Sequence, residues 1–157
     1  MRRVEVDVLV CGEKALNVFD AIIRWERYPQ LVPQIRSTMV HSTWPRAWGS
    51  SSWEVEAPTG KLRWIQEEHF LRDRLEVRFD MTSGDFESFA GRWVMRQQGL
   101  DTALFAEFDI DAGTPCVGSV LEPMIELTIR EIVETAVHGM FPRIRTEGRL
   151  GHATLSA

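Results

Sequence analysis

The last third of the chain constrains the fold more than any other feature. A strand-like run over Thr102–Ile110 meets a turn over Asp111–Pro115, and the long run Ser119–Met140 then has the apolar spacing of a helix. The apolar stripe of that helix comprises Val120, Leu121, Met124, Ile125, Leu127, Thr128, Ile132, Thr135, Ala136 and Gly139. Since the segments before it are strand-like, this one helix is expected to cover the concave face of a whole antiparallel sheet. Such an arrangement often leaves a cavity.

The segments before this helix predict the sheet. Arg3–Cys11 alternates valines with charged residues, Ala15–Trp25 has helical spacing, and Pro29 and Pro33 bracket a short second helical turn. Six strand-like segments separated by short turns follow: Ile35–Ser42, Trp48–Glu56, Lys61–Leu71, Arg74–Met81, Ser88–Arg96 and Thr102–Ile110. We therefore predict an α+β fold, a seven-stranded antiparallel sheet wrapped around a long C-terminal helix.

The ends of that last helix are predicted from its proline and its polar tail. A proline is tolerated in the first turn of a helix, so Pro123 places the start near Gly118 to Glu122. The polar tail from about residue 143 is expected to fray.

Composition excludes several classes of function. The 157 residues fit one domain, 1–157, and the formal charge of −5 is spread along the chain, which disfavours nucleic acid and a polybasic membrane patch. No apolar run approaches the ~20 residues of a membrane span, and the N-terminus is unlike a signal peptide, so we expect a cytoplasmic protein.

The cysteines and histidines give no sign of a disulfide or a metal site. Cys11 and Cys116 are too few for a disulfide framework and are interpreted as core residues. The histidines lack metal-ligand spacing and no phosphate or dinucleotide motif occurs, so no metal and no cofactor is predicted.

Three motifs, taken in order, resemble one superfamily. Trp25–Pro33 resembles an aromatic-Pro-x-Leu/Phe segment, Gly84-Asp85-Phe86 with Gly91-Arg92-Trp93 resembles a strand pair, and Glu107–Pro115 resembles the turn into the long helix. The chain thus resembles the helix-grip, START-like (SRPBCC) superfamily, in its polyketide cyclase (aromatase/cyclase) and coenzyme Q-binding branch. In the aromatase/cyclases, the cavity between sheet and helix folds a poly-β-ketone, and polar residues promote regiospecific aldol closure and dehydration without a cofactor. The resemblance implies a hydrophobic, polyketide-like ligand, an acyl carrier protein as a candidate partner, and a monomer or homodimer.

The resemblance also suggests Glu68 as a catalytic residue. Matching Trp64 to a pocket tryptophan of the family places Gln66 and Glu68 inside the cavity, with Glu68 where the family has an arginine. A carboxyl buried against tryptophan has a raised pKa and suits general acid or base catalysis. The alternative is a solvated glutamate on the outer face of the sheet.

Three further residues are predicted to be catalytic, each with an alternative. The resemblance places the side chain of Asp80 inside the cavity, and Arg78 then lies on the same face, where the two could pair with Glu68 or a substrate carbonyl. The alternative follows from alternation: if Val77 and Phe79 face the core, both charged side chains point outward. Tyr28, the single tyrosine, either donates a hydrogen bond to a substrate carbonyl or packs as an aromatic. His138 on the long helix is a weaker candidate, for a proton shuttle, because a single histidine on a helix is more often a surface or capping residue.

Two functions follow from the predicted cavity. Its ligand-binding walls are expected to be Trp64, Gln66, Phe86, Phe89, Trp93, Ala106, Phe108, Met124, Thr128, Val32 and Ile35. The motif order and aromatic walls favour a cyclase of bacterial secondary metabolism, such as antibiotic biosynthesis. The small Ala106 and the acidic Glu68, at positions that are polar and basic in the cyclases, favour a non-catalytic carrier or sequestration protein for a lipoquinone, a polyene or a finished natural product. A third interpretation, a protein-interaction module, rests on Trp44 and Trp48 alone.

Overall fold

The computed structural model describes residues 1–113 and 115–146. It contains a strand, a helical hairpin, a run of six strands, one long helix and a short last strand. In chain order the elements are β1 (Arg2–Val10), α1 (Ala15–Ile22), the 3-10 turn η1 (Trp25–Arg27), α2 (Tyr28–Leu31), β2 (Ile35–Ser42), β3 (Trp48–Ala57), β4 (Gly60–Leu71), the 3-10 turn η2 (Arg72–Arg74), β5 (Glu76–Gly84), β6 (Ser88–Gln98), β7 (Asp101–Asp111), α3 (Pro115–Met140) and β8 (Ile144–Thr146).

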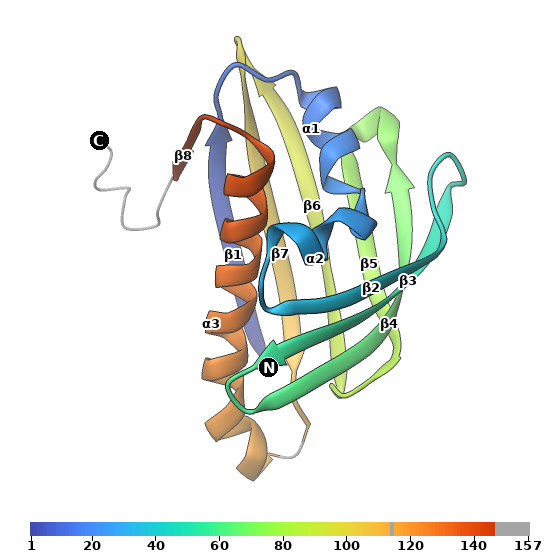
Figure 1. Cartoon of the computed structure of the whole chain (residues 1–157), viewed down its shortest axis with the longest axis vertical. Coiled ribbons are helices and arrows are strands. Elements are labelled where there is room, and N and C mark those ends of the chain that lie inside the picture. The colour runs from blue at the N-terminus through green and yellow to red at the C-terminus, as the bar shows by residue number, and fades with distance from the viewer. Residues whose placement is uncertain (114, 147–157) are drawn as a thin grey trace.

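The strands form one curved antiparallel sheet in the order β2-β3-β4-β5-β6-β7-β1-β8. Figure 1 shows α3 lying along one face of this sheet, with α1 and α2 on the same side. The predicted fold class is therefore confirmed, with eight strands in place of seven. The additional strand is β8, in which Ile144 pairs with Val10 and Thr146 with Val8. The prediction of a frayed tail is wrong for these residues, because the edge of β1 offers them a partner. The rest of the tail lies outside the described residues.

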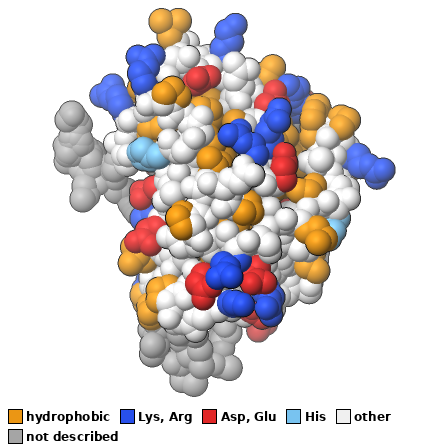
Figure 2. Space-filling view, in the orientation of Figure 1, with side chains coloured by type: hydrophobic (Ala, Val, Ile, Leu, Met, Phe, Trp, Pro, Cys, Tyr) orange, Lys and Arg blue, Asp and Glu red, His pale blue; other side chains and the backbone are white. Residues whose placement is uncertain are grey.

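Strand alternation separates a buried face from an exposed one. On β1, Val4, Val6, Val8 and Val10 are buried beneath α3, while the residues between them face outward. On β7, Leu104, Ala106, Phe108 and Ile110 are buried in the same way. The buried side chains of α3 complete the core; they are Ile125, Ile129, Ile132, Val133, Ala136 and Val137. Figure 2 shows that acidic and basic side chains are interspersed on the surface facing the viewer.

The long helix begins earlier than predicted. It starts at Pro115, a position where a proline costs nothing because the first helical N–H groups have no partner within the helix. Pro123 consequently lies inside α3, and the predicted start between Gly118 and Glu122 is wrong. Arg130 anchors the helix to the sheet, since its Nη1 donates to the Glu5 carbonyl oxygen at 2.8 Å. Among the helices of the described chain, none is long and apolar enough to cross a bilayer.

Candidate functional site

A small cavity lies between α3 and the concave face of the sheet. Its volume is about 50 Å³, and its lining is almost entirely apolar and aromatic. The lining residues are Trp25, Tyr28, Ile35, Trp53, Val55, Trp64, Gln66, Phe79, Phe89, Trp93, Phe108, Ile129, Ile132 and Val133. Gln66 is the one amide or charged side chain among them.

The aromatic wall is built across neighbouring strands. Trp53 on β3 lies directly opposite Trp64 on β4, and their rings stack with centroids 5.8 Å apart and planes inclined by 2°. Phe89 of β6 meets Trp64 edge-on at 5.2 Å. Aromatic pairs at these separations stabilise the fold beyond the burial of their area. They make the lining of the cavity aromatic and rich in carbon.

Behind this wall runs a chain of hydrogen bonds that we call the Glu68 network. Trp53 Nε1 donates to Ser51 Oγ at 2.8 Å, and Ser51 Oγ donates to Glu68 Oε2 at 2.5 Å. From the other side, Trp64 Nε1 donates to Gln66 Oε1 at 2.8 Å, and Gln66 Nε2 donates to Glu68 Oε2 at 2.8 Å. An indole N–H can only donate, so the two tryptophans fix the direction of every bond. Both arms end on the same carboxyl oxygen.

The carboxyl of Glu68 is held in an unusual environment. The side chain is fully buried, and burial raises its pKa, against the opposing effect of the hydrogen bonds from Ser51 and Gln66. Oε1 is buried and has no hydrogen-bond partner among the described residues. Since Oε2 already faces two donors, the proton of the neutral acid belongs on Oε1. In its neutral form Glu68 therefore carries its proton on an oxygen that makes no hydrogen bond to the described residues.

Residues 14–136 match the family described as polyketide cyclase / dehydrase and lipid transport. The chain belongs to this family. A comparison with curated proteins gave no significant match.

Several solved structures have the same fold, and three of them are described by their organism and their similarity to this chain. TTHA0849 from Thermus thermophilus aligns with a TM-score of 0.78 and 23% identity over 88% of this chain and 94% of that one. A START superfamily protein from Mycobacterium smegmatis aligns with a TM-score of 0.74 and 19% identity, over 89% of this chain and 97% of that one. The Zhui aromatase/cyclase from Streptomyces sp. R1128 aligns with a TM-score of 0.67 and 13% identity, over 88% of this chain and 93% of that one. At these identities the likeness establishes the predicted helix-grip fold.

The structure brings part of the predicted ligand-binding set to the cavity. Six of those residues line it: Ile35, Trp64, Gln66, Phe89, Trp93 and Phe108. Four are buried without lining it: Val32, Phe86, Ala106 and Thr128. Met124 is 38% exposed, so its predicted place in the wall is wrong. The buried stripe of α3 is displaced from the predicted one, since it includes Ile129, Val133 and Val137 and leaves Leu127 exposed.

Several wall residues were not among the predicted ligand-binding residues. They are Trp25, Trp53, Val55, Phe79, Ile129, Ile132 and Val133, together with Tyr28, which was predicted in another role. Alternation along β3 and β5 could have identified Trp53, Val55 and Phe79. Trp25 was predicted as the last residue of the helical run Ala15–Trp25, but α1 ends at Ile22 and Trp25 lies in the short turn η1.

Tyr28 lines the cavity, but its hydroxyl is occupied. The phenol donates to the Ile22 carbonyl oxygen at 2.7 Å, and burial raises its pKa far above the usual range. Its ring packs against Trp25 and Trp53. The predicted hydrogen bond to a substrate carbonyl is therefore contradicted, and the alternative of a packing aromatic describes the structure. His138 is exposed, with Nδ1 2.8 Å from the Glu134 carbonyl oxygen, away from the cavity.

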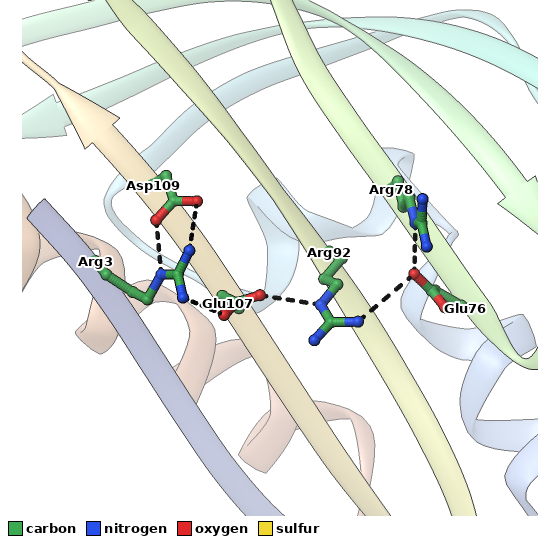
Figure 3. A network of polar contacts seen from close by, with 6 residues as sticks. All are labelled: Arg3, Glu76, Arg78, Arg92, Glu107 and Asp109. Atoms are coloured by element: carbon green, nitrogen blue, oxygen red, sulfur yellow. Dashed lines mark hydrogen bonds and ion pairs between the residues drawn. The ribbon is translucent and has the colours of Figure 1, made fainter. Parts of the chain in front are cut away.

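Arg78 and Asp80 lie on the outer face of β5. The inward prediction is wrong, because Val77 and Phe79 occupy the inner face of that strand. Arg78 Nε donates to Glu76 Oε2 at 2.6 Å, at one end of a surface ion-pair network that Figure 3 shows crossing β5, β6, β7 and β1. Its members are Arg3, Glu76, Arg78, Arg92, Glu107 and Asp109. Within the described residues, no cluster of three or more metal-ligating side chains occurs.

Proposed function

We propose that the protein binds a hydrophobic, ring-containing small molecule of the polyketide type in the cavity between α3 and the sheet. The observation that carries the proposal is the lining: stacked and edge-on aromatic rings around a single amide, Gln66. Apolar walls with few polar groups are the usual form of small-molecule sites. The family description, which covers cyclases and lipid transport, supports the same class of ligand.

The size of the cavity adds a requirement. About 50 Å³ accommodates a few water molecules at ~10–15 Å³ each, whereas pockets for drug-sized ligands measure ~300–1,000 Å³. A ring-containing ligand therefore enters only if α3 or the aromatic side chains move outward. Binding is expected to change the environment of the wall tryptophans, which makes intrinsic fluorescence a direct readout.

A cavity-filling variant tests the proposal. Val133→Phe enlarges a buried wall residue of α3, and Leu127→Phe places the same ring at a 56% exposed position of the same helix as a control. We expect 1,8-dihydroxyanthraquinone to bind the wild-type protein and the control with equal affinity, and Val133→Phe at least tenfold more weakly. Circular dichroism checks that both variants are folded. Absence of binding to the wild type, or equal affinity for both variants, would overturn the proposal.

A second function, cyclisation with dehydration, is favoured by Glu68. As a carboxylate, Glu68 Oε1 takes a proton from a carbon between two ketones; the resulting enolate attacks a distant carbonyl carbon, and the new alkoxide takes up that proton. Loss of a second α-proton to the same oxygen, with return of that proton to the departing hydroxyl, releases water and forms the double bond. A buried carboxyl with a raised pKa suits both directions of transfer. Because Glu68 does not line the cavity, Gln66 must move aside when the ligand binds.

Turnover distinguishes the two functions. Glu68→Gln keeps an oxygen that accepts from Ser51 and Gln66 but cannot exchange a proton, so it should abolish product formation from a synthetic poly-β-ketone thioester and preserve its binding. Glu67→Gln, one position away and exposed, is the matched control and should retain activity. Wild-type protein that binds the thioester without turnover, or a fully active Glu68→Gln variant, would leave binding as the function.

A further inference from the structure

Trp25 combines a place in the cavity wall with an indole N–H that has no acceptor among the described residues. The residue lies in η1, is 2% exposed and lines the cavity. Three buried side-chain atoms of the described chain lack a hydrogen-bond partner: Trp25 Nε1, Glu68 Oε1 and Arg72 Nε. Of these three residues, Trp25 is the one that lines the cavity. Buried donors without an acceptor are rare in folded proteins, so each requires an explanation.

Three other donors of the wall are used within the protein. Trp53 Nε1 donates to Ser51, Trp64 Nε1 donates to Gln66, and the Tyr28 hydroxyl donates to the Ile22 carbonyl oxygen. The fold thus supplies acceptors for the two tryptophans that face each other on β3 and β4 and supplies none for the one in η1.

The Trp25 ring is held firmly in place. The backbone carbonyl oxygen of Trp25 accepts a hydrogen bond from Thr38 Oγ1 at 2.8 Å, which connects η1 to β2. The ring centroid lies 5.6 Å from that of Tyr28 and 5.9 Å from that of Trp53, in tilted and edge-on contacts. A donor fixed in this way loses little entropy when it binds an acceptor, which is the condition for a selective contact.

We propose that Trp25 determines ligand specificity: its indole N–H binds an oxygen acceptor of the ligand, a ketone or quinone carbonyl or a hydroxyl oxygen. The inference rests on the proposed function, because it assigns a polar contact within the same site. An indole N–H donates and never accepts, so the ligand atom must be an acceptor. A pure hydrocarbon of the same shape leaves the N–H unpaired and gains nothing from it.

Two probes that differ by one carbonyl test this proposal. 1-Tetralone and tetralin share a ring system, and their affinities are compared by calorimetry for the wild type, Trp25→Phe and Trp53→Phe. Trp53→Phe is the matched control, because it removes an indole of the same wall whose N–H is already bonded to Ser51. We expect Trp25→Phe to weaken 1-tetralone binding about five- to tenfold, the equivalent of one neutral hydrogen bond, and to change tetralin binding less than twofold. In the control, the ratio of the two affinities should stay at its wild-type value.

A second measurement covers the case in which Trp25→Phe fails to fold. In wild-type protein with ¹⁵N-labelled tryptophan, the Trp25 indole proton, assigned through its contacts with Tyr28 and Trp53, should shift downfield with 1-tetralone and not with tetralin. An unchanged signal, or an equal loss of affinity for both probes in Trp25→Phe, would overturn the role of Trp25 and leave ligand binding standing. Failure of both probes to bind the wild type would overturn the proposed function and this inference together.

Discussion

Ser51→Ala tests the Glu68 network at its central atom. Ser51 Oγ accepts from Trp53 Nε1 and donates to Glu68 Oε2, and the side chain is fully buried. The substitution therefore removes two hydrogen bonds and leaves one indole N–H without an acceptor. Because alanine retains the Cβ and adds no bulk, packing around the position changes little.

The expected loss of stability can be worked out from these two bonds. A hydrogen bond to a charged group contributes about 1.5–3 kcal/mol, and a buried donor left unpaired costs about 1–3 kcal/mol. A water molecule entering the space of the lost hydroxyl recovers part of this. We expect the free energy of unfolding to fall by about 3 kcal/mol at a pH where Glu68 is ionised. The fall should be smaller in acid, because Ser51 donates more weakly to the neutral Glu68 carboxyl than to the carboxylate.

Urea unfolding, followed by tryptophan fluorescence and circular dichroism at several pH values, measures this loss. Ser50→Ala is the matched control, since Ser50 is the neighbour of Ser51 on β3 and points to the opposite face of the sheet. Its free energy of unfolding should change by no more than about 0.5 kcal/mol. If Ser51→Ala costs no more than Ser50→Ala, the Glu68 network does not stabilise the fold and the reasoning fails.

Three further predictions follow from burial and packing. Burial raises the pKa of Glu68, so the folded state keeps its proton at a pH where the unfolded state has lost it. The free energy of unfolding should therefore fall as pH rises between the unfolded and folded pKa values, and Glu68→Gln should flatten that fall in urea titrations at a series of pH values. Gly91→Ala should lower the free energy of unfolding by about 1–3 kcal/mol in thermal melts, because the added Cβ would overlap the Glu107 carbonyl oxygen and the Phe79 ring; an unchanged melting temperature would contradict the packing. Arg78→Ala should change stability by less than about 1 kcal/mol and leave anthraquinone affinity unaltered, because the side chain is half exposed on the outer face; weakened binding would contradict that placement.

Most of the architecture could be predicted from alternation and turn residues. β2 was predicted with the bounds it has, and alternation divided β4 into two faces, of which the one with Trp64, Gln66 and Glu68 is buried. β8 could not be predicted, because three residues with one partly buried apolar side chain show no recognisable period. Its existence depends on the free edge of β1, which is a property of the assembled sheet.

The candidate site was predictable only in part. On β4 the resemblance placed Glu68 inside, where the structure has it, while the strand pattern left a solvated outer face open. On β5 they disagreed, and alternation was right: Phe79 is paired with Glu68 across the sheet, so a register that brought Asp80 inward would have turned Phe79 out to solvent. The cavity volume and the unpaired Trp25 N–H depend on ring orientations that no single-sequence pattern encodes.

The direction of the Glu68 network separates the two candidate functions in physical terms. Both of its arms converge on Oε2, so the network orients the carboxyl and leaves Oε1 available. Gln66 belongs to the cavity wall and to the network at once. A carrier needs Gln66 to stay where it is, because the wall is then complete and Glu68 remains sealed behind it. A cyclase needs Gln66 to release Glu68 when the ligand enters, at the cost of its bond from Trp64. The same side chain therefore decides whether a bound ligand meets only aromatic rings and the Trp25 donor or also meets a proton-transferring acid.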